Sequence, residues 1–337
     1  MKKLILIMMS ALLLVGCGNN ASNASVDSSA DAKTESENGD SISVVTTIFP
    51  EYDWVKQITG DSENVELTML LDNGVDLHNY QPTADDIMKI ATCDVFIYVG
   101  GESDEWVEDA LAEAVNPDMQ VINLLEVLGD SVKEEEVVEG MEAEEEASEE
   151  GEAEAEKEVE YDEHVWLSLK NAKVLVNAIA DTLETVDSAN ADVYEANAKT
   201  YVGQLEALDG QYDEVVRGAT LDTVLFGDRF PFRYLVDDYE LNYYAAFVGC
   251  SAETEASFET ITFLAGKMDE LGLKTIFTIE NSDQKIAKTI IENTEAKDAK
   301  ILTMDSMQST TSEDVADGVT YLSIMESNLE VLAEAIN

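Results

Sequence analysis

Short apolar, β-branched segments alternate with helix-patterned segments in both halves of this chain, and that alternation constrains its fold more than any other feature. In the first half we expect strands at residues 43–49, 65–71, 94–99 and 121–124. In the second half we expect strands at residues 223–226, 243–248, 275–279 and 301–304. Helical segments separate these strands, a pattern typical of parallel sheets flanked by helices. The sequence therefore predicts an α/β fold.

One long helix is predicted between the two halves, at residues 188–217. Its apolar residues recur alternately four and three positions apart, which makes one continuous stripe: Tyr194, Ala198, Tyr201, Leu205, Leu208, Tyr212 and Val215. A coiled-coil partner helix would show the same stripe. The α/β segments on both sides favour instead a rigid helix that joins two lobes, residues 43–187 and 218–337.

The first residues read as an export signal. Lys2 and Lys3 precede an apolar run that is too short to remain as a membrane-spanning helix. Residues 1–16 are therefore expected to be a signal peptide. The run ends in Leu-Val-Gly-Cys, which resembles a bacterial lipobox and implies cleavage before Cys17 and lipidation of its thiol. An ordinary secreted protein is the alternative. Residues 17–42 are polar and predict a flexible tether to the outer face of the cell membrane.

Acidity excludes one large class of partners. The formal net charge is -53, which opposes binding to nucleic acids and attracts cations. A merely solvated acidic surface explains the same charge. Residues 134–160 are the most acidic run, and such like-charge blocks are expected to be disordered. This run is either a weak collector of metal ions or solvated filler.

The chain has two histidines, His78 and His164, and both lie in short junctions with a carboxylate shortly before them. Imidazole is the commonest side-chain ligand of borderline-soft divalent metals, so the pair predicts one shared site. Acidic residues also follow predicted strands, at Asp228, Glu280 and Asp305, where open α/β sheets bind ligands.

Cys93 and Cys250 are far apart and belong to no Cys-x-x-Cys pair. We expect free thiols, with a disulfide as the alternative, and no thiolate metal site.

Several motifs together resemble the lipid-anchored substrate-binding proteins of zinc and manganese ABC importers. They are Thr-Thr-Ile-Phe-Pro at residues 46–50, the loop at residues 76–83, Gly-Gly-Glu at residues 100–102, Glu-His-Val-Trp-Leu-Ser at residues 163–168, and Leu-Thr-Met-Asp at residues 302–305. The resemblance covers residues 43–337. It implies two α/β lobes, each with a mostly parallel sheet flanked by helices, joined by one long rigid helix. It also implies a metal ion between the lobes, a membrane permease as partner, and a monomer.

The resemblance carries over His78, His164 and Asp305 as metal ligands. The fourth family position falls on Arg229, whose guanidinium has no lone pair to offer a metal. Asp228 or, more weakly, Glu280 could supply the missing oxygen, or a water could. We expect Arg229 to pair with Asp305 or Asp228.

Trp166 is expected to pack beneath the loop that carries His164. Two neutral nitrogens favour Zn²⁺ over Mn²⁺ as the cargo. A zinc hydrolase and a surface adhesin are the alternatives to a transport protein. The sequence contains neither the His-Glu-x-x-His motif nor the third histidine that would support a zinc hydrolase.

Overall fold

The computed structural model describes residues 41–60, 62–142, 160–251 and 255–337. The predicted signal peptide, Cys17 and nearly all of the predicted tether lie outside these residues. None of the helices described here has the length and apolar character that crossing a membrane requires.

The first sheet is parallel, with the strand order β2-β1-β3-β4. Its strands are β1 Ile42–Thr46, β2 Val65–Met69, β3 Val95–Tyr98 and β4 Gln120–Asn123. The helices of this half are α1 Phe49–Thr59, α2 Ala84–Thr92, α3 Trp106–Ala112, α4 Leu124–Leu128 and α5 Leu169–Val186. The central strands β1 and β3 are largely buried, as expected of parallel strands covered on both faces.

The second sheet repeats the arrangement with the strand order β6-β5-β7-β8, also parallel. Its strands are β5 Thr223–Phe230, β6 Asn242–Val248, β7 Thr275–Ile279 and β8 Lys300–Met304. Its helices are α7 Arg233–Asp238, α8 Phe258–Leu271, α9 Lys285–Asn293, α10 Ser312–Ala316 and α11 Tyr321–Ile336. The predicted fold class, two lobes that each hold a parallel sheet with helices, is confirmed.

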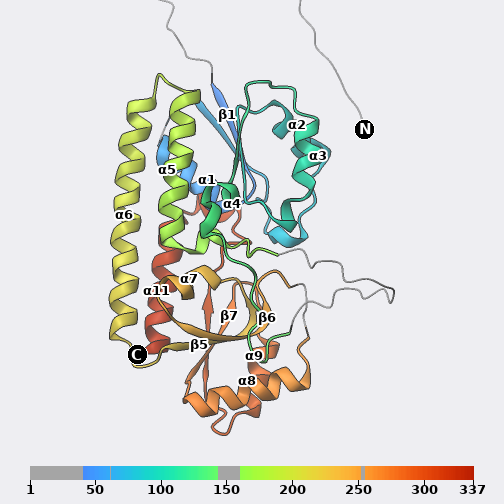
Figure 1. The fold of residues 1–337 in the computed structure, drawn as a ribbon, viewed down its shortest axis with the longest axis vertical. Coiled ribbons are helices and arrows are strands. Elements are labelled where there is room, and N and C mark those ends of the chain that lie inside the picture. Colours follow the sequence, from blue (N-terminus) through green and yellow to red (C-terminus); the bar gives the residue numbers. More distant parts are fainter. Residues whose placement is uncertain (1–40, 61, 143–159, 252–254) are drawn as a thin grey trace, which may run out of the picture. The chain divides into compact units, whose positions relative to one another are not determined.

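The long helix between the halves is α6, Ala191–Gly218, and it begins three residues later than predicted. The predicted apolar stripe is buried from Tyr194 to Tyr212. In Figure 1, α6 runs beside α5 and continues past α11. The helix therefore packs against elements of both lobes, although the boundaries assigned to the lobes remain predictions.

The last helix ties the two lobes together. The backbone N–H of Tyr321, the first residue of α11, donates to Asp53 Oδ2 of α1 at 3.1 Å. The Tyr321 ring also packs edge-on against Trp54, with ring centroids 5.3 Å apart. One hydrophobic core consequently includes buried residues of both sheets.

Residues 134–160 were predicted to be disordered, but residues 134–142 have an ordered structure. Glu142 forms an isolated parallel bridge with Phe247 of β6, and its N–H donates to the carbonyl of Ala246 at 2.9 Å. Glu136 pairs with Arg233 at 3.1 Å. The run therefore has fixed partners on the second lobe up to Glu142, because a sheet edge and a cation supply them. Residues 143–159 lie outside the described part.

Candidate metal centre

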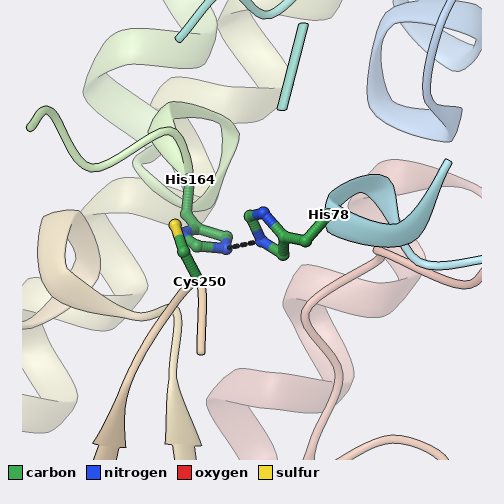
Figure 2. A group of neighbouring side chains, drawn as sticks. All are labelled: His78, His164 and Cys250. Atoms are coloured by element: carbon green, nitrogen blue, oxygen red, sulfur yellow. Dashed lines mark hydrogen bonds between the residues drawn. The ribbon is translucent and has the colours of Figure 1, made fainter. Parts of the chain in front are cut away.

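Three side chains from separate loops form a candidate metal centre. His78 lies in the 3-10 turn Leu77–Asn79 that follows β2, and His164 directly precedes the turn Val165–Leu167. Cys250 lies two residues after the end of β6. The potential ligand atoms of the three residues all lie within 4.8 Å of one another. Figure 2 shows the two imidazole rings approaching from opposite sides, with Cys250 reaching in from the end of a strand.

The two imidazoles face each other through the same ring nitrogen. His78 Nε2 lies 3.2 Å from His164 Nε2. Two nitrogens that ligate one tetrahedral zinc ion, each at about 2.0–2.1 Å, lie about 3.3 Å apart. The observed separation is therefore close to what one shared zinc ion requires, and the predicted pairing of the two histidines in one place is seen directly.

The other nitrogen of each ring is held by a polar partner. His164 Nδ1 lies 3.0 Å from Asp162 Oδ1, which also accepts the backbone N–H of His164 at 2.9 Å. His78 Nδ1 lies 2.7 Å from Ser103 Oγ and 3.6 Å from Glu163 Oε2. Partners of this kind orient metal-binding imidazoles and fix which nitrogen is free to ligate. Both Nε2 atoms thereby face the space between the two rings.

Burial sets the protonation of the two rings differently. Burial and the neighbouring His164 ring lower the pKa of His78 to about 3, so this ring is neutral near pH 7. Burial also lowers the pKa of His164, but the Asp162 carboxylate more than offsets that effect and the pKa is raised overall. A metal ion therefore competes with a proton chiefly at His164.

Local backbone structure brings these residues close together. Asp76 caps the turn of His78, with Oδ1 accepting the His78 N–H at 3.1 Å. Gly249 lies against the His164 ring, since a Cβ at this position would be 2.8 Å from His164 Cε1. Only glycine allows the segment after β6 to approach His164 this closely without displacement.

Arg229 joins the loops that carry two of the three residues. Its Nη2 donates to Asp76 Oδ2 at 2.5 Å, and its Nη1 donates to the carbonyl of Ser251 at 3.5 Å. We predicted pairing with Asp305 or Asp228, and that prediction is wrong. The reason is that β5 continues to Phe230 with a register shift before Arg229, so the guanidinium extends from a strand end toward the His78 loop.

Asp305 and Glu280, two of the predicted carboxylate ligands, are engaged elsewhere. Asp305 Oδ1 accepts the N–H of Met307 at 2.8 Å. Glu280 accepts the N–H and the hydroxyl of Ser306, each at 2.7 Å, and the N–H of Gln308 at 3.2 Å. Within the described chain, neither belongs to the group formed by the two histidines and Cys250.

Asp228 is also outside that group. Its Oδ1 accepts the backbone N–H of Arg229 at 2.9 Å, while its buried Oδ2 has no hydrogen-bond partner among the described residues. Asp228 lines a cavity of about 460 Å³ together with Glu280 and Arg229, and neither histidine borders that cavity. Metal ligation by Asp228, Glu280 or Asp305 stays a prediction.

Trp166 packs against the ring of His164. Its ring centroid is 5.3 Å from that of His164, and its Nε1 donates to the carbonyl of Ser306 at 2.9 Å. The indole is fully buried. Trp166 therefore supports the His164 ring and links it to the segment that follows β8.

Cys250 is the member of the group that sequence reasoning missed. Neither Cys93 nor Cys250 forms a disulfide, so the alternative of a disulfide between them is excluded. Cys93 is buried beside β3, where burial and Asp94 raise the pKa of its thiol to about 12. Cys250 is only half-buried. Cys250 lies two residues after the predicted strand at residues 243–248, as Asp228 does after the strand at residues 223–226, and this position is the signal in the sequence that could have found it.

A cavity of about 430 Å³ leads to the candidate centre. His78, Cys250 and Glu163 border it on the inside, and the exposed residues Glu102 and Glu105 border it at the surface. Its carboxylates lower the electrostatic energy of an approaching cation. The arrangement can admit a small cation and bind it through nitrogen and sulfur.

Comparison with known proteins identifies the relatives of the chain. The model of the ZnuA family, described as zinc-uptake complex component A, periplasmic, matches residues 44–335. The chain is 32% identical to the zinc-binding lipoprotein AdcA of Streptococcus pneumoniae serotype 4, over 99% of this chain but 61% of AdcA. It therefore spans about three fifths of that relative.

A shorter relative matches over nearly its whole length. The chain is 31% identical to the high-affinity zinc uptake system protein ZnuA of Bacillus subtilis, over 96% of this chain and 94% of ZnuA. Among solved structures, the Zn(II)-bound ZnuA-like domain of Streptococcus pneumoniae AdcA superimposes with a TM-score of 0.67 and 27% identity. That match covers 88% of this chain and 99% of the domain.

Proposed function

Because the chain belongs to the ZnuA family of zinc-uptake components, we propose that it captures one zinc ion outside the cytoplasm and delivers it to an ABC-type permease. The observation that carries this proposal is the 3.2 Å approach of His78 Nε2 to His164 Nε2. Each ring is held on its far side, by Ser103 and Asp162, so both Nε2 atoms face one point.

Capture and release follow from the placement of the donors. Both histidines belong to the first half of the chain, whereas the third member of the group, Cys250, lies near a strand end of the second sheet. Moving the two halves apart therefore removes that donor and weakens binding without disturbing the imidazoles. Because the family is named for zinc uptake, we favour transport of a zinc ion over hydrolysis by a bound zinc ion.

The direct test is a zinc titration of the metal-free protein against a chromophoric chelator. We expect one tightly bound zinc ion per chain, and we expect His78→Ala and His164→Ala each to abolish tight binding. Asn79→Ala, an exposed neighbour of His78, is the matched control and should bind as the wild type does. If either histidine variant binds zinc with wild-type affinity, the proposed site is refuted. If the wild type binds manganese more tightly than zinc, the proposed cargo is wrong.

We also propose that the chain is held at the membrane by a lipid on Cys17 and acts as a monomer. The support for the anchor is the Leu-Val-Gly-Cys sequence that ends at Cys17. Replacing Cys17 with alanine should release the protein from the cell surface into the medium. Light scattering of the purified protein tests the monomer.

A further inference from the structure

We propose that Cys250 is the third protein ligand, so that the site selects thiophilic divalent ions such as zinc and cadmium over manganese. This inference rests on the proposed function, because it concerns the same site and the same cargo. It adds a sulfur donor where the sequence pattern had led us to expect oxygen.

The distances allow the thiol to join the two imidazoles. The ligand atoms of His78, His164 and Cys250 lie within 4.8 Å of one another. Nitrogen and sulfur ligands of one tetrahedral zinc ion, at about 2.0–2.1 Å and 2.3 Å from the metal, lie about 3.6 Å apart. Zinc therefore needs to shorten the separation between sulfur and nitrogen by about 1.2 Å at most.

The backbone on both sides of the thiol is held in place. Before it, Gly249 packs against the ring of His164 with no room for a side chain. After it, the carbonyl of Ser251 accepts from Arg229, whose guanidinium is also paired with Asp76 of the His78 loop. Arg229 thus ties the segment of Cys250 to the segment of His78 across the two halves of the chain, and the thiol is positioned rather than incidental.

Three nearby carboxylates are engaged in other contacts. Asp76 is paired with Arg229, and Asp305 accepts the N–H of Met307. Glu280 accepts three hydrogen bonds from the Ser306 and Gln308 segment. Recruiting Asp76 or Glu280 as a ligand would require breaking these contacts. These three carboxylates are held by other residues, whereas the thiol belongs to the group that contains the two imidazoles.

Charge is consistent with a thiolate at this position. When zinc binds, a Zn–S bond forms and the thiol proton passes to solvent, which leaves one net positive charge on an ion held by one thiolate and two neutral imidazoles. Asp162, hydrogen-bonded to His164, lies directly behind that charge. Glu163 Oε2, which is buried and has no hydrogen-bond partner in the described part of the chain, lies 3.6 Å from the His78 ring.

The donor set determines which metals are preferred. Thiolate and imidazole suit zinc and softer ions, whereas manganese is best matched by oxygen-rich shells with more ligands. The cavity bordered by His78, Cys250 and Glu163 opens onto this group of ligands. Through that opening, water or a carboxylate can complete the shell.

The first experiment uses the wild-type protein and follows alkylation by iodoacetamide, with the modified cysteine located by mass spectrometry. The metal-free protein should be modified at Cys250, and one equivalent of zinc should slow this reaction at least tenfold. Buried Cys93 is the internal control and should stay unmodified in both states. Equal rates at Cys250 with and without tightly bound zinc overturn the inference.

The second experiment compares Cys250→Ser with Cys93→Ala as the matched control. The cobalt-loaded wild type and the control should show a thiolate-to-cobalt charge-transfer band in the near ultraviolet, and Cys250→Ser should lose it. Zinc affinity should fall at least tenfold in Cys250→Ser, with manganese affinity changing less than threefold. A variant that keeps both the band and the affinity contradicts the inference.

The two proposals fail in different ways. If the wild type binds zinc, His164→Ala does not, and Cys250→Ser binds as the wild type does, the proposed function stands and the thiolate ligand is refuted. If the wild type binds no zinc, the proposed function itself fails.

Discussion

Arg229 and Asp76 form a salt bridge of 2.5 Å between the end of β5 and the loop that carries His78. Both side chains are mostly buried, with 16% and 19% of their surface exposed. Asp76 also caps the turn of His78 through its other oxygen. Burial alone would raise the pKa of Asp76, and the Arg229 guanidinium more than reverses this, so the pKa is lowered. The salt bridge therefore helps to define where the first imidazole stands.

Arg229→Gln should weaken zinc binding about tenfold and lower the free energy of unfolding by about 1–3 kcal/mol, because it leaves a largely buried carboxylate without its partner. Arg229→Lys should restore part of both losses. The matched control is Arg217→Gln, which breaks an exposed pair with Asp213 and should change stability by less than about 1 kcal/mol. Chelator competition and urea denaturation measure the two effects, and equal affinities in both glutamine variants would show that Arg229 has no positioning role.

Asp162→Asn should reduce zinc affinity about 10- to 100-fold while the protein stays folded. The carboxylate accepts from both the Nδ1 and the backbone N–H of His164, and losses of this size are typical when the partner of a metal-binding imidazole is removed. The measurement is zinc competition with circular dichroism as the check on folding. An unchanged affinity would mean that His164 is oriented by packing on Trp166 alone.

Much of the fold could be predicted from sequence, because strand and helix periodicities differ. The apolar stripe of α6 fixed the helix to within three residues at its start. The short helices α4 and α10 were missed because each has five residues, too few to show a period. The prediction that β5 ends at Phe226 was wrong, since a bulge lets the strand continue past a glycine and two charged residues.

The two histidines could be found because they are scarce and their surroundings are alike. Cys250 could not be found by spacing, since it lies in a different half of the chain from both histidines and no motif links them. The three residues come together because the end of β6, in the second sheet, lies beside the loops that carry His78 and His164 in the first half of the chain. The pairing of Arg229 with Asp76 escaped prediction for the same reason.

Gly249→Ala should lower zinc affinity at least about tenfold, because the added methyl group would lie 2.8 Å from His164 Cε1 and 3.0 Å from the carbonyl oxygen of Phe230. The matched control is Gly210→Ala in α6, where a Cβ meets nothing within 4 Å. That control should keep wild-type affinity and gain about 0.5–1 kcal/mol of stability, since alanine favours helix over glycine. Similar zinc affinities in the two variants would exclude a close-packing role for Gly249.

Glu51 gives the metal-free protein a pH dependence that is separate from the metal site. Burial, followed by repulsion from Asp104, raises the pKa of Glu51 well above its ordinary value. A carboxyl whose pKa is raised by folding stabilises the folded state while it is protonated, and that contribution is lost as pH rises from the unfolded value through the folded one. Wild-type stability should therefore decline with increasing pH relative to Glu51→Gln.

Urea denaturation of the metal-free protein at pH 5, 6.5 and 8 measures this dependence. As pH rises, the free energy of unfolding of Glu51→Gln should increase relative to that of the wild type. Glu66→Gln, at an exposed position on β2, is the control and should run parallel to the wild type. A Glu51→Gln curve that also runs parallel would mean that Glu51 is ionised at no net cost to folding.

The most direct test of the central claim is a crystal structure of the zinc-loaded protein with anomalous diffraction recorded on both sides of the zinc absorption edge. We predict one strong zinc peak between His78 Nε2 and His164 Nε2, about 2.0–2.1 Å from each nitrogen, with Cys250 Sγ at about 2.3 Å. A zinc peak coordinated by Asp305, Glu280 or Asp228 without both histidines would contradict the account.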